Sequence, residues 1–423
     1  MVIKKVDIKA VIQKDVVIVG GGTAGCFAAI AAATSGASTV LIEKNGALGG
    51  TMTVGGVNYP GLFFAWGKQI IGGPCWELIQ RLGDCGDAEI PQMVYKSEHH
   101  WEQQIRINTF ALECELEETC KNSGVDIWFH SVLAHAEESE DHVDLIVCGK
   151  TGMYILRAKK VIDATGDADL VRMLGYECMK SQILQPATLF VKLSGYNPAL
   201  AEEVYVKEKI AEGIREGQLP RLVTVETMLS SLRRSVLDIH EECPLDIDTV
   251  KEKSELELRA RKNALKMVRF LRQMKGFEGL KVEQAAWECA VRESNRVVGE
   301  HVITWEEYIS GVEYEDTVCN AFYPIDLHQE FGIKQKFFAE GVYAHIPYRA
   351  LIPKGARHVL AVGRIISSDA DANSGLRVQA PCMAEGQAAG CAAAIAAAGE
   401  INVKEVDYAE LIKALKKLGA FFD

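Results

Sequence analysis

The first strongly patterned stretch of the chain is a short apolar run that leads directly into glycines. Residues 15–19 read DVVIV, and an unbroken β-branched run of this length is typical of a parallel strand buried on both faces. Small and apolar residues fill 23–35, which predicts a helix that ends at Gly36. A second apolar run, 38–42, ends at Glu43. This order of strand, glycine loop, helix, strand and acid predicts a dinucleotide-binding unit.

The glycines of the loop have the spacing that a bound dinucleotide requires. Gly20, Gly22 and Gly25 satisfy G-x-G-x-x-G, which provides a tight turn, a close approach to the pyrophosphate and close packing of the helix on the strand. Free N–H groups at the helix start attract phosphates. Glu43 can accept hydrogen bonds from an adenosine ribose, and its charge argues against the 2′-phosphate of NADP. FAD and NAD both remain open, and the predicted contacts are Gly20, Gly22, Thr23, Ala24, Gly25, Glu43 and Lys44.

A second glycine turn, Gly49-Gly50-Thr51, comes soon after this unit. Such a turn suits a chain that continues along a long, extended ligand. FAD is longer than NAD on the flavin side, so the turn favours FAD. We expect all three residues to contact the cofactor.

Beyond this turn, apolar strands alternate with helical periodicity. No second glycine fingerprint occurs, so we expect no separate NAD(P)H-binding domain. Asp407 and Glu410 have the spacing of a capping box for a last helix that ends at Gly419. The other predicted strands are 124–129, 142–148, 153–158, 161–163, 182–193 and 358–361, and the other predicted helices are 76–82, 101–122, 198–216, 254–275 and 382–398.

The run GGGTAGCFAAIAAATSGASTVLIEKNGALGGT (20–51) resembles the two-dinucleotide-binding-domain flavoprotein superfamily of the glutathione reductase and fumarate reductase kind. Within that superfamily, four later segments resemble the FAD-dependent oxidoreductase family. They are RESNRVVGE (292–300), YPIDLH (323–328), YRALIPKG (348–355) and the glycine-rich run at 359–390. The family's substrates are diverse, so the resemblance names no substrate.

The resemblance implies further cofactor contacts. The backbone near Val132 would pair with the adenine, the turn Ala164-Thr165-Gly166 would pass the pyrophosphate, and Gly363 would lie near the flavin. The superfamily often has Gly-Asp where this chain has Gly363-Arg364, so a ribityl contact through an Asp does not carry over. Arg364 and Arg377 would both lie near the flavin, beside the start of the 382–398 helix.

The predicted fold class is α/β: a Rossmann-like FAD/NAD(P)-binding fold whose parallel sheet carries a β-hairpin or meander crossover, with an inserted α+β substrate or cap domain. We assign 11–58, 99–175 and 340–400 to the FAD-binding domain, 59–98 and 176–339 to the substrate or cap domain, and 401–423 to a C-terminal helix.

Four side chains are candidates for catalysis: His328, Arg364, Arg377 and Tyr348. His328 is the first candidate for handling the proton that accompanies hydride transfer, because imidazole titrates near neutral pH. Either arginine could bind a substrate carboxylate or the flavin, or could form a structural ion pair.

A charged cluster and two cysteines could each have either a role in the site or a purely structural role. Arg292, Glu293 and Arg296 form a charged cluster that suits either a substrate or a network between domains. Cys26 and Cys382 stand at helix starts, where thiol pKa values fall. We interpret both thiols as core residues, with covalent flavin attachment as the alternative.

Composition narrows the class of protein. Forty-six Lys and Arg against 58 Asp and Glu give a net charge of −12, which argues against nucleic-acid binding. The longest apolar stretch, 388–399, is shorter than the roughly 20 residues of a membrane span, and the N-terminus does not read as a signal peptide. Twelve cysteines without any C-x-x-C predict reduced thiols and a cytoplasmic location. We expect no metal, because His99-His100 and the other histidines lack ligand spacing.

The predicted function is FAD-dependent oxidoreduction, with hydride transfer between flavin N5 and a small organic substrate in either direction. One alternative is an NAD-binding biosynthetic protein of the thiazole-synthase kind. Another is the flavin subunit of a larger electron-transfer complex, with a partner chain carrying iron–sulfur clusters. A homo-oligomer is compatible with the sequence.

Overall fold

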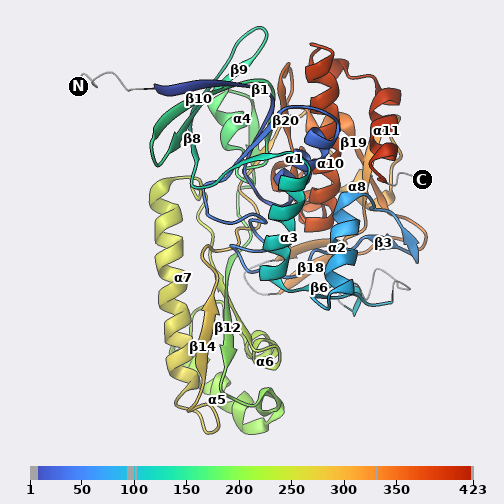
Figure 1. Cartoon of the computed structure of the whole chain (residues 1–423). Helices are drawn as coiled ribbons and strands as arrows, with labels where there is room; N and C mark the ends of the chain where they lie inside the picture. Colours follow the sequence, from blue (N-terminus) through green and yellow to red (C-terminus); the bar gives the residue numbers. More distant parts are fainter. Residues whose placement is uncertain (1–7, 93–99, 101, 329–331, 421–423) are drawn as a thin grey trace.

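The computed structural model describes residues 8–92, 100, 102–328 and 332–420. Its larger body is built on one seven-stranded sheet (Figure 1). The strand order is β7-β2-β1-β10-β9-β8, and β20 also pairs with β10. Strands β7, β2, β1, β10 and β20 are parallel, while β8 and β9 form an antiparallel meander with β10, as the predicted fold class requires. The bounds are β1 (Ile8–Val19), β2 (Thr39–Ile42), β7 (Asp126–Trp128), β8 (Val132–Glu138), β9 (Val143–Gly149), β10 (Gly152–Asp163) and β20 (Val359–Ala361).

Strand β10 corrects one detail of the prediction. The sequence predicts separate strands at 153–158 and 161–163, but the structure has one continuous strand. The reason is that β1 pairs with it from Met153 to Asp163. The first part of β10 also pairs with β9, and its last three residues pair with β20.

Two helices on this sheet pack so closely that glycines of one lie against the backbone of the other. Helix α10 (Gln379–Ala398) packs against α1 (Thr23–Thr34), and both are almost entirely buried. A Cβ on Gly386 would lie 2.2 Å from the carbonyl oxygen of Ala24, and a Cβ on Gly390 would lie 2.2 Å from that of Ala28. Helix α10 begins at Gln379, three residues before the predicted start, with Val378 as its N-cap.

We expect Gly386→Ala to destabilise the protein by about 1–3 kcal/mol, because the added methyl group forces the two helices apart. Gly399→Ala is a matched control, since Gly399 has an ordinary helical φ of −80° and its nearest neighbour would be 3.4 Å from the new Cβ. Urea unfolding of both variants measures the difference. Equal midpoints would contradict close helix packing at Gly386.

The starts of two helices differ from those that hydrophobic periodicity predicts, because capping side chains determine where each helix begins. Helix α3 (Thr109–Asn122) starts well after the predicted 101, because the Asn108 side chain accepts the N–H groups of Phe110 and Ala111. Helix α7 (Val250–Leu271) starts before the predicted 254, because Thr249 caps it. The helix predicted at 198–216 is divided into η2 (Pro198–Glu202) and α5 (Val204–Arg215).

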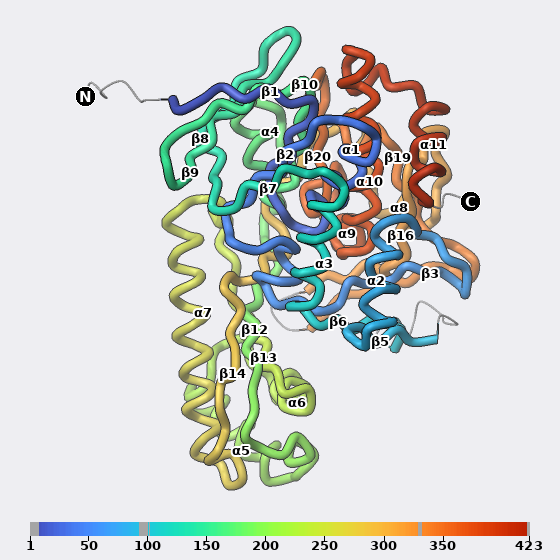
Figure 2. Tube along the Cα trace, viewed as in Figure 1, coloured from blue at the N-terminus to red at the C-terminus, as the bar shows by residue number. Residues whose placement is uncertain are grey.

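A second lobe has its own hydrophobic core, formed by residues between Leu184 and Val291. Its sheet has the order β13-β12-β14, with β12 (Ala187–Ser194), β13 (Val236–Glu241) and β14 (Lys281–Ala285). Figure 2 shows this lobe extending from the body, with the long helix α7 beside β14. Residues 62–82 and 297–352 supply side chains to the larger core instead. The exact domain boundaries therefore stay a prediction.

The remaining elements surround these two cores. Within the described residues no helix is both long and apolar enough to cross a membrane. The other helices are α2 (Pro74–Asp84), α4 (Asp169–Met173), α6 (Val225–Arg233), α8 (Trp305–Ser310), α9 (Ala370–Leu376), α11 (Tyr408–Lys417), η3 (Tyr348–Leu351), η4 (Gly363–Ile365) and η5 (Val403–Glu405). The other strands are β3 (Phe64–Ala65), β4 (Lys68–Gln69), β5 (Ala88–Glu89), β6 (Arg106–Ile107), β11 (Cys178–Lys180), β15 (Asn295–Val297), β16 (Thr317–Ala321), β17 (Ile325–His328), β18 (Ile333–Lys336) and β19 (Ala344–Pro347).

Candidate functional site

A cavity of about 1090 Å³ lies at the carboxyl ends of β1, β2 and β10 and is lined by residues of both lobes. It exceeds the roughly 300–1,000 Å³ of pockets for drug-sized ligands. Three predicted site residues, Gly25, Gly49 and Tyr348, are not on its wall. The predicted residues that line it are Gly20, Gly22, Thr23, Ala24, Glu43, Lys44, Gly50, Thr51, Val132, Ala164, Thr165, Gly166, His328, Gly363, Arg364 and Arg377.

The fingerprint glycines differ in what surrounds them. Gly20 has a φ of +104°, and a Cβ there would lie 2.5 Å from the carbonyl oxygen of Ala164. A Cβ on Gly25 would lie 1.9 Å from the carbonyl oxygen of Gly20, so Gly25 packs the helix against the loop beneath the cavity surface. A Cβ on Gly22 would meet no atom within 4 Å. Gly22 is therefore the position where the bare backbone faces the cavity.

The second glycine turn is joined directly to the first. The Gly49 N–H donates to the carbonyl oxygen of Gly21 at 2.8 Å. A Cβ on Gly50 would lie 2.9 Å from the Cα of Gly22. Gly49 thus supports the fingerprint loop from behind, while Gly50 and Thr51 continue the cavity wall.

Glu43 directly follows β2, and both of its carboxylate oxygens accept hydrogen bonds from the backbone. Its Oε2 accepts the Gly21 N–H at 2.7 Å, and its Oε1 accepts the Asn45 N–H at 2.8 Å. These bonds fix the carboxylate on the cavity wall and leave further lone pairs for a ligand hydroxyl. The neighbouring Lys44 pairs at 3.2 Å with Glu288 of the second lobe, so it joins the two lobes at this end of the cavity.

We expect Glu43→Gln to weaken FAD binding about tenfold, because a charge-assisted hydrogen bond is replaced by a neutral one. The amide keeps the side-chain volume but cannot accept with both of its polar atoms. Glu118→Gln on the exposed surface of α3 is the matched control. Fluorescence titration of the apoproteins with FAD measures both affinities, and equal values would remove Glu43 from cofactor binding.

A buried carboxylate organises the Ala164-Thr165-Gly166 turn. Asp163 accepts the Thr165 N–H at 2.9 Å, the Thr165 hydroxyl at 2.7 Å and the Val171 N–H at 3.0 Å. Burial raises the pKa of Asp163, and these hydrogen bonds oppose the rise. Sequence reasoning missed this residue, although an acid at the end of an apolar strand was the available signal.

Arg364 fastens the same turn to the second lobe. Its Nε donates to the carbonyl oxygen of Gly166 at 2.7 Å, its Nη1 to that of Val291 at 2.5 Å, and its Nη2 to Asp167 at 2.8 Å. Burial by itself raises the pKa of Asp167, but Arg364 and Ser294 lower it below its usual value. Arg364 therefore forms the structural ion pair that was one of its alternatives, and it also lines the cavity.

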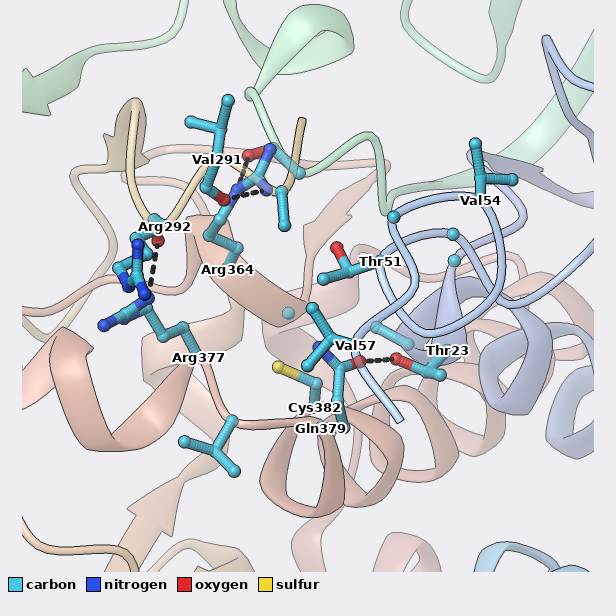
Figure 3. A pocket seen from close by; sticks show the side chains of 18 of the residues that line it. Thr23, Thr51, Val54, Val57, Val291, Arg292, Arg364, Arg377, Gln379 and Cys382 are labelled. Atoms are coloured by element: carbon cyan, nitrogen blue, oxygen red, sulfur yellow. Dashed lines mark hydrogen bonds between the residues drawn. The ribbon is translucent and has the colours of Figure 1, made fainter. Parts of the chain in front are cut away.

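The start of α10 reaches the middle of the cavity (Figure 3). Gln379 bonds to the Thr23 hydroxyl, which connects α10 to α1. Six residues further along α10, Glu385 is fully buried and accepts the Gly363 N–H at 2.7 Å. Burial raises the pKa of Glu385 well above its usual value. The N-terminal end of α10 lies on the cavity wall, where the helix dipole favours negative charge on a ligand.

The two cysteines at helix starts are core residues. Cys26 and Cys382 are both buried, and burial raises the pKa of each thiol well above its usual value. This is the reverse of the lowering that a helix N-terminus alone would give. Burial therefore opposes formation of a thiolate at either position.

Tyr348 does not belong to the site. It is buried in η3 and its hydroxyl donates to the carbonyl oxygen of Val403 at 2.7 Å. The placement of Tyr348 in catalysis is therefore corrected: the side chain ties η3 to η5 and lies off the cavity wall. His99 lies outside the described residues.

His328 lies on the cavity wall at the end of β17. Its Nε2 is 3.3 Å from Asp326 Oδ2, and its ring centroid is 6.5 Å from that of His240. Burial lowers the pKa of His328, partly offset by Asp326. Burial also lowers the pKa of His240, to about 3. Sequence reasoning missed His240, since nothing local indicates that β13 and β17 meet.

A cavity bordered by two connected glycine turns, an acid fixed by hydrogen bonds and a helix N-terminus defines a dinucleotide-binding protein of the Rossmann type. The chain belongs to the FAD dependent oxidoreductase family, whose model matches residues 15–415. FAD is accordingly its cofactor. The open space at Gly22 fits a pyrophosphate, and Glu43 fits the adenosine ribose. No curated protein matches the chain.

Several solved structures match the chain at low identity. A geranylgeranyl bacteriochlorophyll reductase-like protein from Thermoplasma acidophilum is 13% identical, with 96% of this chain and 83% of that chain covered and a TM-score of 0.44. p-Nitrophenol 4-monooxygenase PnpA from Pseudomonas putida DLL-E4 is 11% identical, with 96% and 84% covered and a TM-score of 0.43. CabE, an aromatic hydroxylase from angucycline biosynthesis, is 15% identical with a TM-score of 0.32. That match covers 42% of this chain and 37% of the hydroxylase, well under half of its length.

Proposed function

We propose that this FAD-dependent oxidoreductase transfers a hydride between flavin N5 and a small organic substrate, without an NAD(P)H domain of its own. One observation carries the proposal. A single cavity has the dinucleotide-binding glycines on one part of its wall and titratable side chains, including His328 and Tyr323, on another. The cofactor's reactive end and a proton acceptor would then face the same enclosed space.

When bound, the flavin supplies the two-electron chemistry. His328 accepts or returns the proton of a substrate O–H or N–H group, and Asp326 orients the imidazole through Nε2. The Tyr323 hydroxyl lies on the cavity wall, and burial raises its pKa, so it remains a hydrogen-bond donor at neutral pH. These groups let the chain hold and move a proton beside the reacting carbon.

The visible absorption spectrum of the purified protein tests the cofactor, before and after acid precipitation. We expect the two bands of oxidised flavin, released into the supernatant. Colour retained in the pellet would indicate covalent attachment. A colourless protein that FAD does not reconstitute would overturn the proposal in favour of an NAD-using biosynthetic role.

Electron partner, assembly and location follow as parts of the same proposal. Reoxidation or reduction of the flavin requires a molecule that docks on the cavity, either a second small substrate or a separate electron-transfer protein. A cytoplasmic location and a homo-oligomer are also proposed. Anaerobic photoreduction followed by addition of oxygen, quinone or ferricyanide ranks the candidate acceptors by their rate of flavin reoxidation.

A further inference from the structure

Two arginines on the cavity wall lack a carboxylate partner. Arg377 is the C-cap of α9, and Arg292 follows β14 along the chain. Figure 3 shows the pair side by side, on the far side of the pocket from Thr23 and the fingerprint loop. The Arg377 Nη1 donates to the backbone carbonyl oxygen of Arg292 at 3.4 Å, so the Arg377 side chain contacts the Arg292 backbone.

Their hydrogen bonds go to neutral acceptors. The Arg377 Nη2 donates to Gln185 Oε1 at 3.1 Å and more weakly to the carbonyl oxygen of Asp326. The Arg292 Nη1 donates to the carbonyl oxygen of Pro186 and to the Thr188 hydroxyl. In the part of the chain that the structure describes, no ion pair joins either guanidinium to a carboxylate. The buried Nε of Arg377 has no partner there either.

Other arginines nearby are satisfied by acids. Arg364 pairs with Asp167 at 2.8 Å, Arg234 with Asp238 at 2.5 Å, and Arg296 with Glu293 at 3.1 Å. A buried charge without a counter-ion is costly, so an unpaired pair of arginines in an enclosed space requires an explanation. Burial and the charge of Arg377 lower the pKa of Arg292 to about 10, which leaves Arg292 cationic at neutral pH. Burial also lowers the pKa of Arg377 from its usual value.

We infer that Arg292 and Arg377 form the carboxylate-binding pocket for the substrate, which is a small organic monocarboxylate. This inference rests on the proposed function, since it places the substrate in the same cavity. A guanidinium presents paired N–H donors whose spacing matches a carboxylate. The pyrophosphate of the cofactor has its own place at Gly22 on the opposite side of the pocket, and so does not account for these charges.

The local charge balance sets the charge of the ligand. Two carboxylates bear on this pair, Glu293 and Asp326. Glu293 follows Arg292 in the chain but is already paired with Arg296 at 3.1 Å, so the two charges cancel. The Asp326 side chain is bonded to His328 at 3.3 Å and to Gln335 at 3.0 Å. Two arginines and one aspartate leave one positive charge, with both histidines neutral. A monocarboxylate neutralises that charge, whereas a dianion would exceed it.

Gln185 connects the anion pocket to the proton acceptor. Its Oε1 accepts from Arg377 and also from the His328 backbone N–H at 3.0 Å. Gln185 is buried and does not line the cavity, so it is a positioning residue. A carboxylate held by Arg377 therefore places the substrate's adjacent carbon near the imidazole. His328 would take the proton of the O–H or N–H group on that carbon, while the C–H hydrogen leaves as a hydride to the flavin.

The test uses the FAD-loaded protein and three carboxylates, acetate, lactate and benzoate, each with its neutral amide. Binding is followed by the change in the flavin visible spectrum and, independently, by the melting temperature. We expect at least one carboxylate to perturb both and its amide to perturb neither. Arg292→Met and Arg377→Met should each weaken binding of that carboxylate about 10- to 100-fold, without changing FAD content. Arg234→Met is the matched control, because this arginine also lines the cavity but keeps an acid partner.

Each contrary result points to a different failure. Wild-type protein that retains FAD but responds to no carboxylate, or to amides equally, overturns the anion pocket and leaves the oxidoreductase intact. Inorganic phosphate that competes as well as the carboxylate overturns the substrate class. Loss of FAD from Arg377→Met assigns the arginine to the cofactor and also overturns the inference.

If a Met variant does not fold, Arg292→Lys keeps the charge but not the paired donors, and unchanged affinity there contradicts the pocket. Wild-type protein without FAD marks failure of the proposed function itself.

Discussion

Gly22→Val should give a folded protein that no longer retains FAD. Gly22 has a φ of −66°, which any residue adopts, and a Cβ there would meet no atom of the chain within 4 Å. The new side chain would instead occupy the part of the cavity where the fingerprint backbone approaches the pyrophosphate. Overpacking of this kind costs about 1–3 kcal/mol, which corresponds to about 5- to 150-fold weaker binding.

Two comparisons make this expectation specific. Gly22→Ala should have a smaller effect in the same direction, and Gly25→Ala should disturb folding itself, because its Cβ would lie 1.9 Å from the Gly20 carbonyl oxygen. Gly399→Ala controls for the loss of a glycine elsewhere. The measurements are the FAD-to-protein ratio and the urea midpoint of the apoprotein. A Gly22→Val variant with wild-type FAD content would place the pyrophosphate somewhere else.

The structure brings most of the predicted glycine-site residues to one cavity wall, because the constraints on them are local. A turn, a close approach and a helix start each depend on residues within about 30 positions, and the β1-α1-β2 unit follows the expected order. Val132 is also on the cavity wall. It follows β7 closely in the chain, and β7 pairs with β2, the strand that leads to Glu43.

The substrate end could be predicted only in part, because its partners are distant in the chain. His328 and Arg377 were candidates from their motifs. Their link through Gln185 joins positions 143 and 192 residues apart, and no local pattern indicates such a pairing. Asp167 likewise could not be matched to Arg364 in advance. Tyr348 was misplaced for the same reason, since its partner lies in η5.

His328→Gln should lower the rate of flavin reduction by the substrate about 10²- to 10⁴-fold, while FAD stays bound. The His328 imidazole lies on the cavity wall and contacts the Asp326 carboxylate, and a glutamine cannot accept a proton. Anaerobic stopped-flow reduction, with the carboxylate found by the binding screen, measures the step directly. A rate within a few-fold of wild type would exclude His328 as the proton acceptor.

The pH dependence follows from the direction of the pKa shift. A base must be neutral, and burial lowers the pKa of His328 below its ordinary value of 6.5, so reduction should remain fast at pH 6.5 and decline only at more acidic pH. Asp326 raises this pKa through its hydrogen bond and its charge, so Asp326→Asn should move the acidic limb to still lower pH and lower the plateau. NMR titration of the ten histidines, with His328→Gln supplying the assignment, measures the same pKa without substrate. An acidic limb above pH 6.5, or one that rises in Asp326→Asn, would contradict a neutral imidazole held by this aspartate.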